Sequence, residues 1–224
     1  MKRISGIFTL VFLLSLFSCS KKEANPKSQD PVVKGTDSSN TDESCHAQLS
    51  DIVNLTIFPA DNSWNQDISA SPVDPYNSQI LAAYSGTGLK ADFGSGLWEG
   101  APIGIPFVVV CGSQKKIPVV FRANSEDGDY GDESDPGPYP IPITAPIEGN
   151  GQGDAHVIAL DKDNSLLYEL YNASVNGDHW EASAGSIFNL ATDQLRQDGW
   201  TSADAAGLPI LPGLVKYDEV ASGT

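Results

Sequence analysis

Two apolar runs flank a short polar turn in the second half of the chain, and this pair limits the fold more than any other feature. Residues 156–160 and 165–172 are rich in Val, Ile, Leu and Tyr, and Asp161-Lys162-Asp163-Asn164 joins them. Such runs on either side of turn-forming residues are typical of a β-hairpin. Both faces of this hairpin are largely apolar, so we expect it to lie centrally in a sheet that is covered on both sides.

The alternation of side chains along the hairpin brings three polar residues together. His156 lies opposite either Glu169 or Tyr171, depending on the register, and all three share one face in both cases. A His, a Glu and a Tyr at one end of a buried face can carry acid–base catalysis, or bind a metal ion with Asp154. The alternative is structural: a buried His–Glu hydrogen bond that orders the core.

Other β-branched runs predict further strands around this hairpin. Single strands are expected at 52–58, 180–190 and 214–220, and a second hairpin at 105–111 and 117–123. Short helical segments are expected at 74–84, where Asp74 precedes Pro75, and at 191–197 and 202–207. The predicted fold class is mostly β, a β-sandwich or a partly open barrel, with two or three short helices and long loops.

The N-terminus carries the features of an export signal. Lys2 and Arg3 precede an apolar run over residues 7–17, which is too short to span a membrane. Leu16-Phe17-Ser18-Cys19 resembles a bacterial lipobox, so residues 1–18 are the expected lipoprotein signal peptide and Cys19 the lipidated residue. Residues 19–44 are polar and are expected to be a disordered tether, which leaves 45–224 as the globular domain. The predicted location is the bacterial outer membrane or cell surface, with the lipid bilayer as partner.

The cysteines and the net charge of the chain suggest one disulfide and exclude one class of partner. Cys45 and Cys111 remain once Cys19 is set aside, and an oxidising compartment favours a disulfide between them; the alternative is two separate thiols. The formal net charge of the chain is −16, which argues against binding to nucleic acid.

A run of carboxylates lies in the long loop at 124–155. Asp127, Asp129, Asp132 and Asp135 have the spacing and the oxygen ligands that suit Ca²⁺, although the loop does not match an EF-hand. The alternative is a solvated acidic loop. Glu133 from the same run can instead pair with Glu169, in the way that two carboxylates act in glycosidases.

Four tryptophans lie near turn residues. Trp64, Trp98, Trp180 and Trp200 have polar neighbours in sequence, which suits aromatic rings that stack on sugars. Tryptophans in such places also serve as core anchors that satisfy one N–H group. The sequence leaves both readings open.

Three longer motifs carry a resemblance to a known family. They are Phe58-Pro59-Ala60-Asp61-Asn62-Ser63-Trp64-Asn65, the stretch DESDPGPYPIP at 132–142, and the stretch GWTSADAAGLPI at 199–210. Together with residues 154–171 they resemble an uncharacterised family of secreted proteins of actinobacteria, myxobacteria and other bacteria, over about residues 55–220. The resemblance implies no catalytic assignment. Members of that family continue past the stretch that matches 217–220, so it implies a C-terminally truncated member.

Two functions of different kinds fit these observations. The first is a carbohydrate-active enzyme, a polysaccharide hydrolase or lyase that uses His156, Glu169, Tyr171 and Glu133 as catalytic residues. The second is a non-catalytic surface protein that binds a glycan or a partner through loop aromatics, with Ca²⁺ as a stabilising ion. The sequence does not decide whether the protein is an enzyme.

Overall fold

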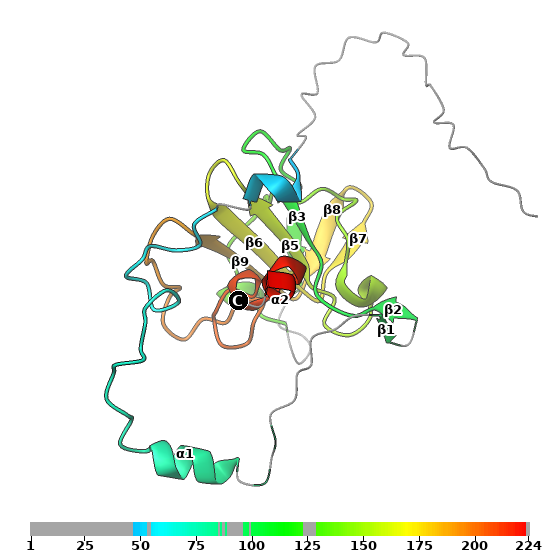
Figure 1. Cartoon of the computed structure of the whole chain (residues 1–224). Helices are drawn as coiled ribbons and strands as arrows, with labels where there is room; N and C mark the ends of the chain where they lie inside the picture. Colours follow the sequence, from blue (N-terminus) through cyan, green and yellow to red (C-terminus); the bar gives the residue numbers. More distant parts are fainter. Residues whose placement is uncertain are drawn as a thin grey trace, which may run out of the picture. The chain divides into compact units, whose positions relative to one another are not determined.

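β-Strands make up most of the regular structure in the described part of the chain. The computed structural model (Figure 1) describes residues 47–52, 55–84, 86, 88, 96–98, 100–122 and 129–222. Within these ranges lie nine strands, two α-helices and four 3-10 helices. The predicted mostly-β fold with few helices is confirmed.

Four strands form the central sheet. Their order is β3 (Phe107–Val110), β5 (Val157–Asp161), β6 (Leu166–Tyr171) and β9 (Ala184–Asn189). β5 and β6 are the predicted hairpin, β9 pairs antiparallel with β6, and β3 pairs parallel with β5. The hairpin therefore occupies the middle of the sheet, as expected.

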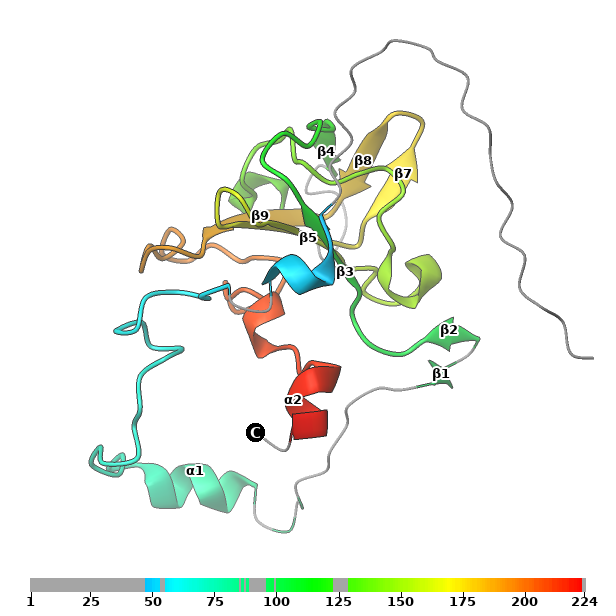
Figure 2. The ribbon, with the colours of Figure 1, turned by 45° about the horizontal axis from the view of Figure 1, so that its top comes forward.

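A second sheet has three strands in the order β4 (Val119–Phe121), β8 (His179–Ala182) and β7 (Ser174–Asn176). Figure 2 shows these strands together on one side of the central sheet. β7 and β8 are joined through Gly177 and Asp178, and the φ of 61° at Gly177 lies in the left-handed region that glycine adopts without strain.

The remaining elements are short. The smallest strands, helices and 3-10 helices are β1 (Leu97–Trp98), β2 (Ala101–Pro102), α1 (Asn77–Ala83), α2 (Tyr217–Ser222), η1 (Leu49–Ile52), η2 (Gly131–Glu133), η3 (Glu148–Gly151) and η4 (Leu211–Gly213). α1 lies within the helix predicted at 74–84, and the Asp74 carboxylate accepts the backbone N–H of Tyr76 just before it. No helix among these described residues is long and apolar enough to cross a membrane.

One long hairpin is shared by the two sheets. Tyr171 is opposite Ala184 in the central sheet, and Ser174 is opposite Glu181 in the second, so the pairing keeps one register across the break between them. At the break Asn172 has a φ of 49°. A bend of this kind lets one pair of strands pass from one sheet to another.

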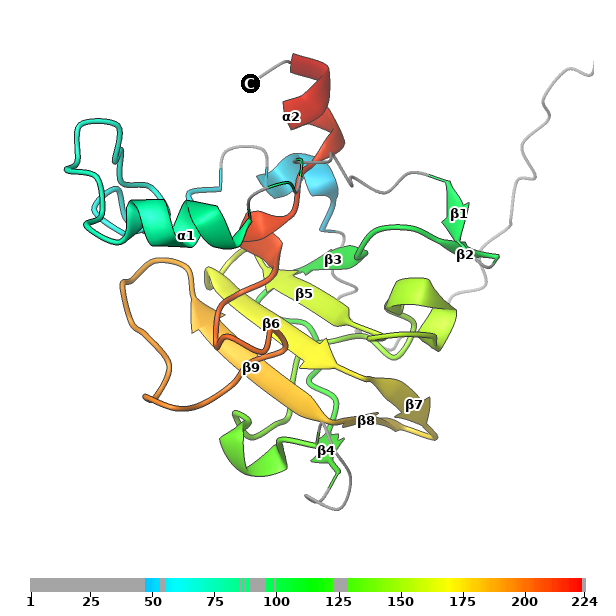
Figure 3. The same cartoon turned by 90° about the horizontal axis from the view of Figure 1, so that it is seen from below.

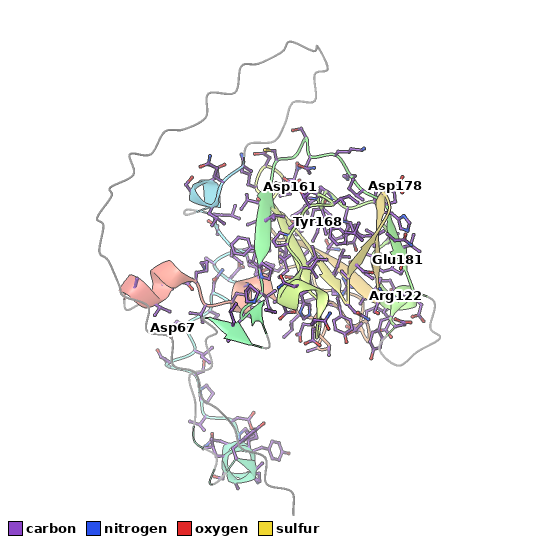
Figure 4. The ribbon with its side chains drawn as sticks, turned by 90° about the vertical axis from the view of Figure 1, so that its right-hand side faces the viewer. Asp67, Arg122, Asp161, Tyr168, Asp178 and Glu181 are labelled. Atoms are coloured by element: carbon purple, nitrogen blue, oxygen red, sulfur yellow. The ribbon has the colours of Figure 1, made fainter. Side chains whose placement is uncertain are left out.

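Arg122 holds this bend. Its guanidinium donates to the Asn172 carbonyl and to the hydroxyls of Ser183 and Ser174, the latter two at 3.1 Å. Its backbone N–H donates to the Ala182 carbonyl at 2.9 Å. Figure 4 shows Arg122 beside the second sheet, on which Glu181 also lies. A single side chain thus contacts both strands of the hairpin where they change sheets.

The two faces of the central hairpin belong to two separate core clusters. Val157, Ala159, Tyr168 and Leu170 pack with Trp180 and the buried residues of the second sheet. Ile158, Leu160 and Leu167 face the other way and pack with Phe188 and Leu211. The predicted cover on both faces is confirmed, and it explains why every residue of β5 is buried.

Several predicted elements are wrong. Residues 105–111 and 117–123 do not form a hairpin, because β3 and β4 find parallel partners in different sheets. The segment 214–220, predicted as a last strand, overlaps α2, and the Glu219 carboxylate accepts the backbone N–H of Lys216 at 2.8 Å at the start of this helix. Residues 191–197 and 202–207 are turns and coil rather than helix.

The first predicted strand, 52–58, is also wrong within its described residues. Residues 55–58 have no ladder partner, and Phe58 has a φ of 61°. The Asn65 side-chain amide donates to the carbonyl groups of Ile57, Phe58 and Pro59 at 2.8 to 3.0 Å. These carbonyls are therefore taken by a nearby loop and not by a neighbouring strand.

Candidate functional site

A cavity of about 570 Å³ lies where the segment 201–214 crosses one face of the central sheet. Figure 3 shows the chain after residue 200 passing over this face. Aromatic, apolar and polar side chains line the cavity together, and its size is that of a small-molecule or oligosaccharide site. The lining residues on which the argument depends are Trp64, Tyr130, Asp154, His156, Tyr171, Thr201, Ser202, Asp204, Ile210 and Leu214.

Aromatic rings form part of the cavity wall. Trp64 is 45% exposed and Tyr130 is 40% exposed, and Tyr171 comes from the end of β6. The loop positions Trp64: its backbone N–H donates to the side-chain oxygen of Asn62 at 3.0 Å, and the Asn65 side-chain amide donates to the carbonyl of Ile57 in the chain before it. These rings are held in place while their surfaces stay open to a ligand.

His156 is a buried residue of the cavity lining and has a hydrogen-bond partner on each ring nitrogen. Nδ1 is 2.6 Å from a carboxylate oxygen of Glu148, and Nε2 is 3.1 Å from the carbonyl oxygen of Ala203. Both partners are acceptors, so only a ring protonated on both nitrogens donates to both. The backbones of His156 and Glu148 also bond to each other, which fixes the pair.

Glu169 lies on the same face but does not open into the cavity. Its side chain is completely buried, and its carboxylate accepts the backbone N–H groups of Ile210 and Leu211 at 3.0 Å. Burial raises the pKa of Glu169 to about 7, against the opposite effects of these two N–H groups and of His156. The partner of His156 is therefore Glu148 and not Glu169.

His156 and Glu169 attach one wall of the cavity, the segment 201–214, to the central sheet. His156 contacts the segment 201–214 at Ala203, and Glu169 contacts it at Ile210 and Leu211. Between these anchors the Ser202 hydroxyl lies 2.6 Å from the carbonyl oxygens of Asp204 and Leu208 and can donate its one proton to either, which tightens the turn of the segment. The wall is thus fixed to the sheet by hydrogen bonds rather than by strand pairing.

The carboxylates predicted as a catalytic or metal-binding set have structural partners. Glu133 accepts the N–H of Thr201 at 2.7 Å. Asp135 forms an ion pair with Arg196 and accepts the N–H of Ile187 in β9. This part of the acidic loop covers the edge of the central sheet, and the structure does not bring Glu133 to Glu169.

The predicted calcium ligands likewise have different environments. Asp129 accepts the Ser183 hydroxyl at 2.6 Å, Asp132 is exposed, and Asp127 lies outside the described residues. No group of three or more His, Cys, Asp or Glu side chains with the geometry of a metal site occurs in the described part of the chain.

The other predicted residues separate into different environments. Trp180 is a core anchor whose indole N–H donates to the Ile141 carbonyl at 3.1 Å, and Trp200 lies beside the Arg196 guanidinium. Cys111 is disulfide-bonded, while its predicted partner Cys45 lies outside the described residues, as does Cys19.

Sequence reasoning brought His156, Tyr171 and Asp154 to one place, and the structure does the same. It missed Glu148 and Asp204. Glu148 stands in a loop of glycines with no periodic pattern, so no local signal marks it as a partner of His156. Asp204 lies in the GWTSADAAGLPI motif, where a single carboxylate among small residues could have marked it as a candidate site residue.

Comparisons with protein-family models, with curated proteins and with solved structures find no match for this chain. The resemblance of the three motifs to a secreted bacterial family stays a prediction.

Proposed function

We propose that the protein is an envelope-anchored lipoprotein that binds a glycan in the cavity under the segment 201–214. The observation that supports this function best is the combination in one cavity of exposed aromatic surface, from Trp64 and Tyr130, with free polar side chains. Sugars present both apolar C–H faces and hydroxyl groups, and a site of this mixed composition suits them. Lipidation of Cys19 would place the cavity at the surface of a membrane.

Binding is favoured over catalysis because three of the four predicted catalytic groups are already engaged. Glu133 and Glu169 accept backbone N–H groups, and both ring nitrogens of His156 face acceptors within the protein. A general acid or base needs hydrogen-bond reach to its substrate. These side chains instead fix the walls of the cavity.

The test is glycan binding by the full chain in mild detergent, measured as retention on immobilised polysaccharides with and without Ca²⁺. Trp64→Ala is expected to weaken binding about five- to tenfold, since it removes the most exposed aromatic face of the cavity. Tyr76→Ala is the matched control, because Tyr76 is 67% exposed and does not line the cavity. Equal retention of both variants, or no retention of the unmodified protein on any glycan, would contradict the proposal.

A carbohydrate-active enzyme is the second candidate, and one observation favours it. His156 faces the Glu148 carboxylate in the cavity, an arrangement that orients an imidazole for proton transfer. In a lyase, a ring protonated on Nδ1 alone would take up the proton beside a uronate carboxylate at Nε2 once Ala203 releases that atom; the C–O bond to the leaving sugar would then break as the double bond forms, and the leaving oxygen would be protonated from water. New oligosaccharides formed by the full chain, and absent with His156→Ala, would establish this function in place of simple binding.

A further inference from the structure

Acidic side chains outnumber basic ones in and beside the cavity, where His156 is the single basic group among the described lining residues. Asp154 and Asp204 both line the cavity, and the Glu148 carboxylate contacts the His156 ring. Of the described residues that line the cavity, none is Lys or Arg. Because the chain as a whole carries a formal charge of −16, distant groups add to the negative potential at this place.

The two aspartates are fixed through their backbones while their carboxylates stay without partners. The Asp154 carbonyl accepts the N–H of Asn172 at 2.8 Å, and the Asp204 N–H donates to the Ser202 hydroxyl at 3.0 Å. Neither side-chain carboxylate has a hydrogen-bond or ion-pair partner in the described part of the chain. The other carboxylates of this region differ, since those of Glu133 and Glu148 are both bound.

We infer that the cavity selects glycans that carry amino groups, and that Asp154 and Asp204 are the residues that recognise the ammonium charge. This inference rests on the proposed glycan-binding function. An ammonium group is complementary to two free carboxylates, and it is attracted to the faces of nearby aromatic rings such as Trp64 and Tyr130. A uronate would meet charge of its own sign and is disfavoured.

The probe is a pair of glucosamine oligosaccharides of equal length, one with free amines and one fully N-acetylated, titrated into the full chain in detergent at about pH 6, where such amines are protonated. The free-amine form is expected to bind about tenfold more tightly, with an affinity that falls as salt is added. A uronic-acid oligosaccharide of the same length is expected to bind more weakly than either.

Two variants assign the effect. Asp154→Asn and Asp204→Asn are each expected to weaken binding of the free-amine form about two- to fivefold, and to weaken binding of the N-acetylated form less, because only the free amine carries a charge that these carboxylates attract. Asp178→Asn is the matched control, because its carboxylate is fully exposed on the turn between β7 and β8 (Figure 4). It is expected to change neither affinity.

The outcomes separate this inference from the proposed function. Equal binding of the two forms, or equal effects of Asp204→Asn and Asp178→Asn, overturns the amino-sugar preference and leaves glycan binding intact. Failure of both forms and of every neutral glycan to bind overturns the proposed function itself. Tighter binding of the uronic-acid oligosaccharide than of the free-amine form also overturns the inference.

Discussion

At the scale of single residues, Glu169 combines two roles that oppose each other. Its carboxylate anchors the cavity wall through the N–H groups of Ile210 and Leu211, yet its complete burial disfavours the charge. The side chain that positions the wall therefore destabilises the folded state at high pH, where its buried carboxylate is charged.

This conflict gives a pH dependence with a definite sign. The pKa of Glu169 is raised from 4.5 to about 7 by burial, so between these values the folded protein retains a proton that the unfolded chain has lost. The free energy of unfolding should fall by about 3 kcal/mol as the pH rises through this window. Urea unfolding at several pH values measures it, and Glu169→Gln should remove that fall. Parallel curves for Glu169→Gln and the unmodified protein would contradict the prediction, and Asp178→Asn serves as the control.

Two buried serines in neighbouring positions predict opposite effects. Ser186 lies opposite Glu169, and its hydroxyl has no partner among the described residues, whereas the Ser183 hydroxyl contacts Arg122, Asn172 and Asp129. Ser186→Ala should leave the free energy of unfolding unchanged or raise it by about 1 kcal/mol, and Ser183→Ala should lower it by about 1–3 kcal/mol. Chemical denaturation of the two variants side by side measures the difference, and a larger loss for Ser186→Ala would show the reasoning to be wrong.

At the scale of elements, the bend of the long hairpin depends on one side chain. Arg122 donates to both strands where they pass between sheets, through a planar guanidinium that lysine cannot reproduce. Arg122→Lys should therefore lower the free energy of unfolding by about 1–3 kcal/mol even though it keeps the charge. An unchanged free energy of unfolding for Arg122→Lys would show that the positive charge alone holds the bend, and would contradict the prediction.

The elements also show what local sequence can predict. The β5–β6 hairpin was predictable because its strands are adjacent and its turn residues stand between them; Asp161 accepts the N–H groups of Asp163 and Asn164 there. The parallel pairs β3–β5 and β4–β8 were not, because their partners are distant in the chain and no local signal records them. The turn at Gly177 and Asp178 carried a recognisable signal that the prediction of a single strand at 180–190 did not use.

In the site, too, contacts between adjacent strands were predictable and contacts with distant segments were not. His156 and Tyr171 were predictable as neighbours because strand alternation places them together. Their relation to Ala203, Ile210 and Glu148 was not, because it depends on how irregular segments cross the sheet. Sequence reasoning left His156 opposite either Glu169 or Tyr171, and in the structure the carboxylate bound to His156 is that of Glu148.

At the scale of the whole molecule, the remaining prediction concerns attachment. If Cys19 is lipidated, the full chain expressed in a bacterial host should fractionate with membranes, and Cys19→Ala should appear in the soluble fraction. Mass spectrometry of the N-terminal peptide measures the modification directly. Cys45→Ser is the control and should stay with the membranes. An unmodified Cys19 in the membrane-bound protein would refute the lipoprotein assignment.

If the chain is exported, its two parallel strand pairs have a consequence for its passage across the membrane. β3 and β4 find their partners only in the second half of the sequence, so neither sheet can assemble while that half is still inside the cell. A chain threaded N-terminus first through a translocation pore would therefore stay extended until late in its passage. Strand pairing of this kind would keep the chain unfolded until late in synthesis, and a narrow export channel admits only an unfolded chain.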